Sequence, residues 1–288
     1  MDTNIQKYIA LLATAESGSI TRAAEGLGYS QSAVSRMIQD LEREWDISLL
    51  ERGRHGVRTT SDGLRLLPHI RRMCADYRDL QTQVDELRGF QTGLIRIGTF
   101  SSVATHWLPN ILLEFQKNCP GIEFELLLGD YSEIEGWILS GRVDCGFLLL
   151  PAHPELETIF LEEDMLLAIL PEEHPLADQP RFPLQAVRDY PFLLLKKGQH
   201  SEISDLLESN HVELEPSLVT LDDYAIMSLV EKGLGISILP QLILRRCPYR
   251  IVMRELDVPA SRKICLAFRK RGSMSLAMEQ FVHYLPYR

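Results

Sequence analysis

The first 44 residues carry a repeating apolar pattern that constrains the fold more than any other feature of the chain. Apolar residues recur every three or four positions over residues 3–16, 20–27 and 31–44, as on one face of three amphipathic helices. Gly28 suits the positive φ of a tight turn before the third helix, and Ser30 suits its amino-terminal cap. Three short helices with a glycine turn between the second and third predict a helix-turn-helix.

The third predicted helix and the segment after it carry groups that suit nucleic acid. The exposed positions near the start of this helix are Gln31, Ser32, Ser35 and Arg36. Their amide, hydroxyl and guanidinium groups can contact base edges and phosphates. Segments 49–52 and 57–60 predict a β-hairpin wing, where Arg52 and Arg54 can reach phosphate or the minor groove. A helical bundle with a solvated polar face is the alternative for the helices alone, as is solvated surface charge for the wing arginines.

Residues 61–88 predict one long helix with a narrow apolar seam. The seam consists of Leu64, Leu67, Ile70, Met73, Tyr77, Leu80, Val84 and Leu87. A seam this narrow on a helix that joins two domains is usually buried by a second copy of the chain. The pattern therefore predicts a homodimer formed through this helix, in preference to packing of the seam against its own domain.

From Leu94 onward, short apolar strands alternate with amphipathic helices, which is typical of open α/β sheets. Strands are expected at 94–97, 124–128, 145–149, 165–170, 192–195, 217–221, 236–239, 251–254 and 264–268. Helices are expected at 104–117, 133–140, 184–189, 201–210, 223–232 and 273–285. About ten strands over this length suggest two sheets.

Open α/β sheets bind ligands at the loops that leave the carboxyl ends of their strands. The candidates at such positions are Phe100, Ser101, Ser102, Asp130, Tyr131, Ser201, Thr220, Leu221 and Asp222. The two serines that open the first helix offer hydroxyls and free N–H groups to an anion or a carbonyl. For Ser101, Ser201 and Asp222, helix capping is the alternative role. The two aspartates disfavour a strongly anionic ligand unless Lys196 or Lys197 compensates.

Charge is divided unevenly along the chain. Residues 1–88 hold 12 Lys and Arg against 13 Asp and Glu, whereas the remaining residues hold 18 against 27. Because a strongly acidic surface repels nucleic acid, any DNA-binding face must be small and locally basic. The arginines of the predicted wing fit that description.

Composition and motifs disfavour a membrane protein, an enzyme and a metal site. The chain is 45% hydrophobic and 24% charged, which is typical of soluble globular proteins. Its apolar stretches fall short of the ~20 residues that a membrane span needs, and its start does not resemble a signal peptide, so we expect a cytoplasmic protein. Phosphate-loop, GxSxG and HExxH motifs are absent, so we expect no catalytic residue. The five scattered cysteines predict buried thiols and no metal site, with a redox pair as the alternative.

Nine segments in one order and spacing carry a family resemblance. They are Ala23-Ala24-x-x-Leu27, 30–36, Leu41-Glu42, 49–52, 59–63, 95–98, 120–123, 141–144 and 233–240. Together they resemble the LysR-type transcriptional regulators over the full length of the chain. Trp45-Asp46 stands where that family commonly has Leu-Gly, and Leu50 where it often has Phe; these differences put little in doubt.

The resemblance implies a domain plan and a set of partners. It implies a winged helix-turn-helix at 1–60, a linker helix at 61–92 and an effector-binding domain at 93–288 that is similar to periplasmic binding proteins. The effector domain would divide into subdomain I, at 93–161 and 267–288, and subdomain II, at 162–266. Family members usually form tetramers, contact two sites upstream of a promoter and respond to a small molecule bound between the subdomains. We therefore expect double-stranded promoter DNA, a small-molecule effector and RNA polymerase as partners, and no cofactor or metal.

Two other classes of protein are alternatives to a regulator. A ligand-binding or transport protein fits the effector half alone, but the first 88 residues and the missing export signal count against it. A cytosolic α/β enzyme with a helical dimerisation arm would need catalytic motifs that the sequence lacks. Salt-dependent binding to promoter DNA distinguishes the regulator from both.

Overall fold

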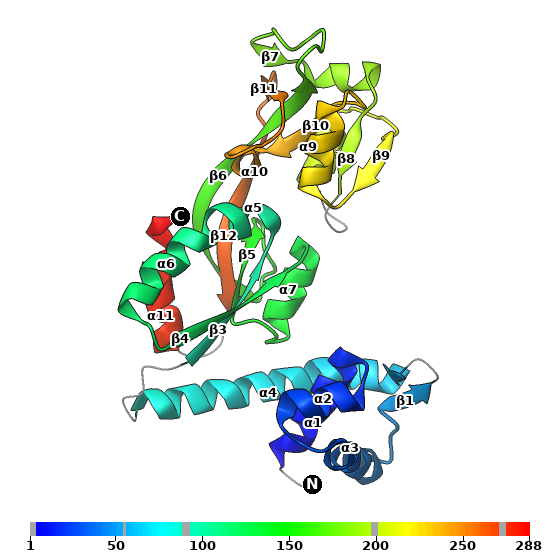
Figure 1. Ribbon diagram of the computed structural model, residues 1–288, viewed down its shortest axis with the longest axis vertical. Helices are drawn as coiled ribbons and strands as arrows, with labels where there is room; N and C mark the ends of the chain where they lie inside the picture. Colours follow the sequence, from blue (N-terminus) through cyan, green and yellow to red (C-terminus); the bar gives the residue numbers. More distant parts are fainter. Residues whose placement is uncertain (1–3, 54–55, 88–92, 197–200, 271–274) are drawn as a thin grey trace. The chain divides into compact units, whose positions relative to one another are not determined.

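The computed structural model describes residues 4–53, 56–87, 93–196, 201–270 and 275–288, which form two units that divide near residue 89 (Figure 1). The amino-terminal unit is helical apart from one hairpin, and the larger unit alternates strands with helices. The predicted class, an α/β protein with a helical amino-terminal domain, is therefore confirmed.

Three helices open the amino-terminal unit: α1 (Ile5–Ser17), α2 (Ile20–Leu27) and α3 (Gln31–Trp45). Gly28 ends α2 with a φ of 69°, a left-handed conformation that glycine adopts without strain. The Ser30 hydroxyl accepts a hydrogen bond from the Ala33 N–H at 3.2 Å and so satisfies a free donor in the first turn of α3. The glycine turn and the serine cap predicted between the second and third helices are confirmed.

These helices share an apolar core. Leu11, Val34 and Leu41 are fully buried in it. Helix α2 buries the small side chains of Ala23 and Ala24, and it contacts both α1 and α3. Small side chains let helix backbones approach closely, so α2 and α3 can cross as a helix-turn-helix requires.

The predicted wing is a hairpin of β1 (Leu50–Gly53) and β2 (Gly56–Thr59), which pair antiparallel. The Val57 N–H donates a hydrogen bond to the Gly18 carbonyl at 2.9 Å and ties the hairpin to the end of α1. A Cβ on Gly56 would lie 2.6 Å from the same carbonyl oxygen, so this close approach requires glycine. The wing therefore has a fixed attachment to the helices.

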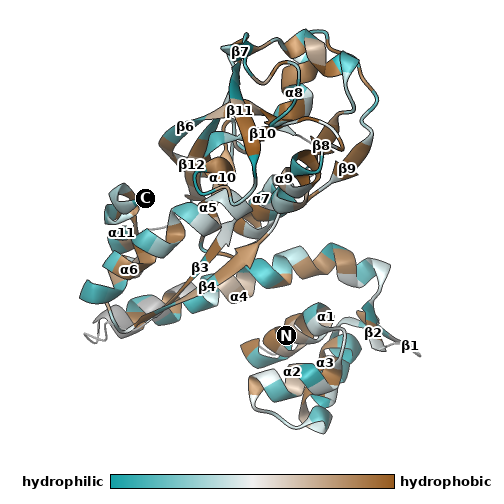
Figure 2. Cartoon of the chain, turned by 45° about the horizontal axis from the view of Figure 1, so that its top comes forward, coloured by the Kyte–Doolittle hydropathy of each residue, from teal (hydrophilic) through white to brown (hydrophobic). Residues whose placement is uncertain are grey.

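Helix α4 (Ser61–Leu87) follows the wing, and its apolar residues differ in burial. Leu67 and Ile70 are buried in the core of the amino-terminal unit. The exposed apolar residues of the helix are Leu64, Met73, Leu80 and Val84. Figure 2 shows hydrophobic and hydrophilic stretches alternating along this helix. The prediction that the whole seam is kept for a second copy is wrong for Leu67 and Ile70, because the first three helices also need an apolar cover.

The larger unit is built on one long sheet with strand order β4-β3-β5-β12-β6-β11-β7, and β10 also pairs with β6. These strands are β3 (Gly93–Thr99), β4 (Ile122–Leu128), β5 (Cys145–Leu149), β6 (Leu156–Pro171), β7 (Arg181–Phe182), β10 (Ser237–Pro240), β11 (Ile251–Leu256) and β12 (Ser261–Arg269). A separate parallel pair consists of β8 (Leu193–Leu195) and β9 (Leu218–Thr220).

Strands β6 and β12 are longer than the sequence predicts. The expected short strands at 165–170 and 264–268 are only parts of them. Strand β6 pairs with β12 along its first part and with β10 and β11 along its last part, so one long sheet holds eight of the strands. With the β8–β9 pair the larger unit contains two sheets, as predicted, but the strands are divided unevenly between them. Glu162, Glu163 and Asp164 interrupt the apolar run of β6 and concealed its length.

Helices cover the sheet and connect its strands. They are α5 (Ser101–His106), α6 (Leu108–Asn118), α7 (Tyr131–Leu139), α8 (Glu202–Ser209), α9 (Asp223–Glu231), α10 (Gln241–Leu244) and α11 (Leu276–His283), with 3₁₀ turns η1 (Leu184–Asp189) and η2 (Leu285–Tyr287). The single helix predicted at 104–117 is wrong, since α5 ends before Trp107 and α6 begins after it. Pro109 in the first turn of α6 explains the break, because proline cannot continue a preceding helix.

Two apolar cores lie within the larger unit. Phe115, Phe147 and Phe281 belong to the first core, so the carboxyl-terminal helix α11 packs with elements from the start of the unit. Phe192 and Ile226 belong to the second core. Strand β6 contributes residues to both cores and connects them through its own backbone, whereas β12 contributes to the first core.

Candidate functional sites

One side of α3 presents polar groups, and the other side is buried. The four residues that the sequence predicts for DNA contact are Gln31, Ser32 and Arg36, which are exposed, and Ser35, which is half-buried. Val34, Ile38 and Leu41 of the same helix are buried. Because helical neighbours three and four positions apart share a face, the buried residues fix the direction of the polar side. All four candidates therefore remain accessible.

The hydroxyls on this face are held by short local contacts. The hydroxyl oxygens of Ser30 and Ser32 lie 3.0 Å apart, and the Ser35 hydroxyl accepts a hydrogen bond from the Gln39 amide at 3.5 Å. Exposed hydrogen bonds of this kind contribute little net stability, so they can be exchanged for new partners. A helix with short polar groups along one side matches the width of the major groove.

The wing is described only in part. Arg58 on β2 is exposed and lies opposite Glu51 of β1. Arg52 is a residue of β1, but its side chain is not among the described ones, and Arg54 lies outside the described residues. Contact of Arg52 and Arg54 with DNA therefore stays a prediction.

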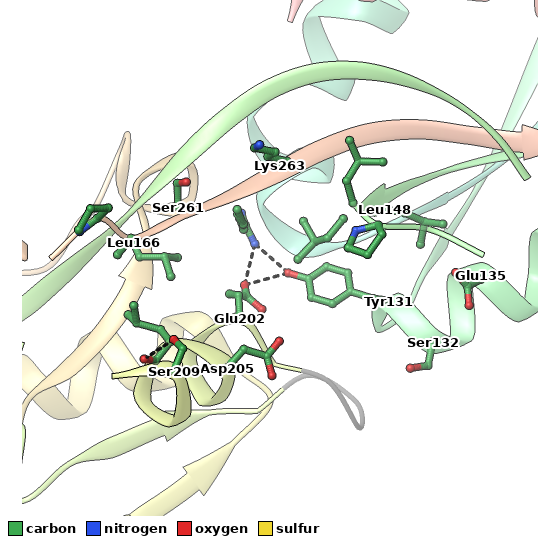
Figure 3. A pocket seen from close by; sticks show the side chains of 17 residues that line it. Tyr131, Ser132, Glu135, Leu148, Leu166, Glu202, Asp205, Ser209, Ser261 and Lys263 are labelled. Atoms are coloured by element: carbon green, nitrogen blue, oxygen red, sulfur yellow. Dashed lines mark hydrogen bonds and ion pairs between the residues drawn. The ribbon is translucent and has the colours of Figure 1, made fainter. Parts of the chain in front are cut away.

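The larger unit contains a cavity of about 790 Å³. Figure 3 shows that side chains from α7, α8 and β12 converge on it. Its apolar lining includes Leu148, Leu150, Leu166 and Leu206. Its polar lining includes Tyr131, Glu202 and Arg262. Cavities of roughly 300–1,000 Å³ with an apolar wall and a few convergent polar groups are typical small-molecule sites.

A buried arginine organises the polar side of this cavity. Nε of Arg262 donates to Oδ2 of Asp164 at 2.9 Å, and Nη2 lies 2.8 Å from the same oxygen. Nη1 donates to the Tyr131 hydroxyl at 2.8 Å and to Oε1 of Glu202 at 3.1 Å. Nη2 also donates to the Ser102 hydroxyl at 2.8 Å. One guanidinium thus joins α5, α7, α8 and β6 through hydrogen bonds that satisfy its buried charge.

Aromatic rings and a second hydrogen bond complete the cluster. The Tyr131 hydroxyl donates to Oε1 of Glu202 at 3.0 Å, as a dashed line marks in Figure 3. The Phe100 ring lies 5.2 Å from the Arg262 guanidinium carbon and meets Tyr131 edge to face at 5.1 Å. A cation above an aromatic face is attracted by the ring quadrupole, so Phe100 helps to hold the guanidinium in place.

The protonation states in this cluster follow from burial and from the neighbouring charges. Burial raises the pKa of the Tyr131 phenol well above its ordinary value, and Glu202 raises it further. Burial alone would lower the pKa of Arg262, but attraction to Tyr131, Glu202 and Asp164 outweighs burial and raises it. Tyr131 is therefore a neutral hydrogen-bond donor and Arg262 a cation at neutral pH.

Three of the nine sequence candidates for effector binding meet at this cluster: Phe100, Ser102 and Tyr131. Ser101 opens α5 directly before Ser102 and is half-buried. Their convergence agrees with their origin, because Ser102 and Tyr131 follow the carboxyl ends of the neighbouring strands β3 and β4.

The remaining candidates make contacts within the chain itself. Asp130 accepts a hydrogen bond from the Glu133 N–H at 2.8 Å, and Asp222 accepts one from the Tyr224 N–H at 2.9 Å, as helix caps do. The buried Ser201 hydroxyl donates to a backbone carbonyl of β8. Thr220 accepts a hydrogen bond from the Asp222 N–H, and Leu221 is exposed. None of these five lines the cavity described above.

Sequence reasoning missed the charged centre of the cluster. Asp164 and Arg262 face each other across β6 and β12, 98 positions apart in the sequence. Glu202 is an acidic residue in the first turn of α8, a position that many helices fill with acids. A signal existed only at Arg262, which lies two residues before the strand predicted at 264–268 and, by the two-residue repeat of a strand, shares a face with Ile264 and Leu266.

Other chemistry has little support in the described part of the chain. All five cysteines are free thiols, and burial raises the pKa of Cys74 and of Cys265 to about 11, so little thiolate forms near neutral pH. No group of three or more metal-ligating side chains occurs among the described residues. Within the same residues, every helix is too short or too polar to cross a membrane.

Two family models match the chain, one for each unit. A model described as bacterial regulatory helix-turn-helix protein, lysR family, matches residues 5–64. A model described as LysR substrate binding domain matches residues 88–287. The chain therefore belongs to the LysR family of bacterial transcriptional regulators, as the sequence resemblance predicted.

Curated relatives agree with this family over nearly the whole chain. The uncharacterized helix-turn-helix transcriptional regulator YvbU of Bacillus subtilis is 31% identical over 271 residues, which cover 93% of this chain and 92% of YvbU. The probable transcriptional regulator LrrA of Synechococcus elongatus is 35% identical over 263 residues, which cover 91% of this chain and 89% of LrrA. The protein is a DNA-binding transcriptional regulator with an effector-binding domain, and the enzyme and transport alternatives are not supported.

Solved structures share the fold. A full-length OxyR variant from Pseudomonas aeruginosa matches with a TM-score of 0.76 and 20% identity, covering 99% of this chain and 95% of that one. CbnR in complex with its target DNA matches with a TM-score of 0.69 and 23% identity, covering 99% of both chains. At these identities the likeness concerns the fold.

Proposed function

We propose that the exposed side of α3 reads the bases of a promoter duplex. The residues that would contact the major groove are Gln31, Ser32, Ser35 and Arg36. The observation that carries this proposal is their shared exposure opposite the buried Val34 and Leu41. Arg52 and Arg54 of the wing would contact phosphates or the minor groove. The CbnR neighbour was solved with target DNA and has a similar fold over its full length, which supports this mode of binding.

The proposed effector site is the cavity beside Arg262. Its size suits a small molecule, and its wall combines leucines with a few fixed polar groups. It lies between the proposed subdomain I (93–161 and 267–288) and subdomain II (162–266), since Tyr131 comes from the first and Glu202 from the second. Tyr131 is the sequence candidate that would face the polar end of the ligand, and Ser102 would position Arg262 through their hydrogen bond. No cofactor is part of the proposal.

The proposed assembly is a homodimer formed through the exposed apolar residues of α4, with pairs of dimers forming a tetramer. Leu64 and Leu80 on this helix are 62% and 57% exposed, and apolar residues repeated along one helix are typically covered by a partner helix. RNA polymerase is the further partner expected of a regulator, and the cytoplasm is the expected location. Sedimentation of the full chain tests the assembly.

The salt dependence of duplex binding tests the proposed function most simply. The full chain would first select binding sites from a pool of random-sequence duplexes, and its affinity for a selected site would be measured by fluorescence anisotropy. A regulator that neutralises six to ten phosphates is expected to lose about 10³- to 10⁵-fold in affinity between 50 and 200 mM salt. Failure to select any sequence, or binding that is insensitive to salt, would contradict the proposal.

A further inference from the structure

The Arg262 guanidinium has one permanent partner and one exchangeable partner. Asp164 is permanent, because it lies opposite Arg262 in the strand register of β6 and β12 and also accepts the Leu242 N–H at 2.9 Å. Its carboxylate is therefore held by backbone as well as by charge. Glu202 is the exchangeable partner, because it comes from the first turn of the eight-residue helix α8 and is held by side-chain contacts.

Two donors converge on a single oxygen of Glu202. The Tyr131 O–H and the Arg262 Nη1–H approach Oε1 at 3.0 and 3.1 Å. A phenol and a guanidinium that aim their hydrogens at one point form a binding site for a carboxylate oxygen. Since both hydrogens carry positive partial charge, only a hydrogen-bond acceptor can take the place of Glu202 there.

Glu202 reaches this site from the other side of the cavity. Helix α8 buries Ile203 and Leu206 in the second core, whereas Tyr131 packs against the first. The carboxylate thus holds α8 to residues of the first core through side-chain hydrogen bonds, whereas β6 connects the two cores through its backbone. The cavity beside it is lined by Leu148 and Leu166, which offer an apolar surface next to the carboxylate position.

We propose that Glu202 is an internal stand-in for the effector, and that an effector with a carboxylate and a compact apolar body displaces it from Tyr131 and Arg262. This inference rests on the proposed use of the cavity as the effector site. One carboxylate replaces another in direct contact with the guanidinium, so the number of its carboxylate partners is unchanged by the exchange. Helix α8 loses its link to α7 in the process, which gives the ligand a direct means of altering how the two subdomains are held.

The test uses the full chain and two matched probes, propionate and propylammonium, at equal ionic strength. Glu202→Ala empties the carboxylate position, and Glu208→Ala is the control, because Glu208 is an exposed glutamate on the same helix outside the cavity. The shift of melting temperature with probe concentration gives an apparent affinity for each variant. We expect propionate to bind Glu202→Ala at least tenfold more tightly than it binds the wild type or the control, and propylammonium to show no such gain.

A second substitution tests whether propionate binds at the position of the Glu202 carboxylate. Tyr131→Phe in the Glu202→Ala background removes one of the two donors and is expected to weaken propionate binding about tenfold, as loss of a hydrogen bond to a charged group does. Should Glu202→Ala fail to fold, Glu202→Gln takes its place, because a neutral amide keeps the shape and competes less well than a carboxylate. The expected gain then has the same direction and a smaller size.

Two outcomes would overturn the inference. Equal propionate responses in the wild type and the Glu202 variants would mean that Glu202 does not occupy a ligand position. Stabilisation of the wild type by propylammonium that is lost in Glu202→Ala would assign the cavity to cations instead. Duplex binding is measured on the same preparations without probe. Absence of duplex binding by the wild type would contradict the regulator function. Normal duplex binding without tighter propionate binding by the Glu202 variants would contradict only the carboxylate site.

Discussion

The two candidate sites of this chain are built in opposite ways. The polar face of α3 comes from four residues within the range 31–36, of which three are exposed and Ser35 is half-buried. The Arg262 cluster joins residues as far as 160 positions apart and buries the guanidinium, whose side chain is 2% exposed. The first site is positioned by buried residues on the other side of the same helix, such as Val34 and Leu41. The second site is positioned by the hydrogen bonds and ion pairs among its own residues.

In α3, the residues proposed to bind DNA differ from the residues that stabilise the fold. In the Arg262 cluster, the residues proposed for effector binding also stabilise the fold. Polar residues on α3 can be replaced without disturbing the core formed by Val34 and Leu41. Replacement of Arg262 or Asp164 leaves a buried charge without its partner, which is costly wherever it occurs. Substitutions in the two regions should therefore give different kinds of defect.

The largest effect is expected from Arg262→Met. It leaves the buried Asp164 carboxylate without its counter-charge, so the free energy of unfolding of the larger unit should fall by about 3–5 kcal/mol. Urea unfolding monitored by tryptophan fluorescence measures this, since Trp107 and Trp137 lie in that unit. Adding Asp164→Asn should restore part of the loss. A free energy of unfolding within about 1 kcal/mol of the wild-type value would contradict this account, because the cluster would then not stabilise the larger unit.

A smaller and more local effect is expected from Leu41→Ala. This residue is fully buried in the amino-terminal core, so the truncation should destabilise that unit by about 2–5 kcal/mol through lost burial and the cavity left behind. Trp45 at the end of α3 reports the transition by its fluorescence. The transition of the larger unit should stay where it is in the wild type. Equal shifts in both transitions would show that the units do not unfold independently.

The smallest effect is expected from Ser30→Ala. Its hydroxyl caps α3, and loss of such a cap typically costs about 0.5–2 kcal/mol of stability. Ser32→Ala is the matched control, because it removes the exposed contact between the Ser30 and Ser32 hydroxyls but leaves the hydrogen bond from the Ala33 N–H to Ser30, so its effect on unfolding should stay within about 0.5 kcal/mol. Thermal unfolding followed by circular dichroism compares the two. A loss in Ser32→Ala as large as in Ser30→Ala would contradict the assigned cap.

The sequence predicted the amino-terminal region well because its signals are local. Gly28 and Ser30 mark a turn and a cap through their own backbone and hydroxyl chemistry, and the structure confirms both. The spacing of Val34 and Leu41 fixed the buried side of α3 and thus the accessible side. The use of that accessible side in DNA contact stays a prediction that binding experiments must test.

The effector region was predicted only where a general rule of α/β sheets applies. Ser102 and Tyr131 were found because they follow the carboxyl ends of strands. Arg262 and Asp164 were missed because they come together only through the pairing of β6 with β12. The residues near each of them in the sequence do not indicate that the two form an ion pair. Glu202 was missed because an acidic residue in a first helical turn has an ordinary explanation.

Binding of a selected duplex by Arg36→Ala, measured by gel shift at one fixed salt concentration beside its unfolding free energy, tests the central claim most directly. We expect specific affinity to fall by about 1–3 kcal/mol, which is about fivefold to 150-fold, because the guanidinium would no longer contact the duplex. Stability should stay within about 0.5 kcal/mol of wild type, since Arg36 is exposed. Unchanged affinity in a folded variant would contradict the assignment of the α3 face to DNA.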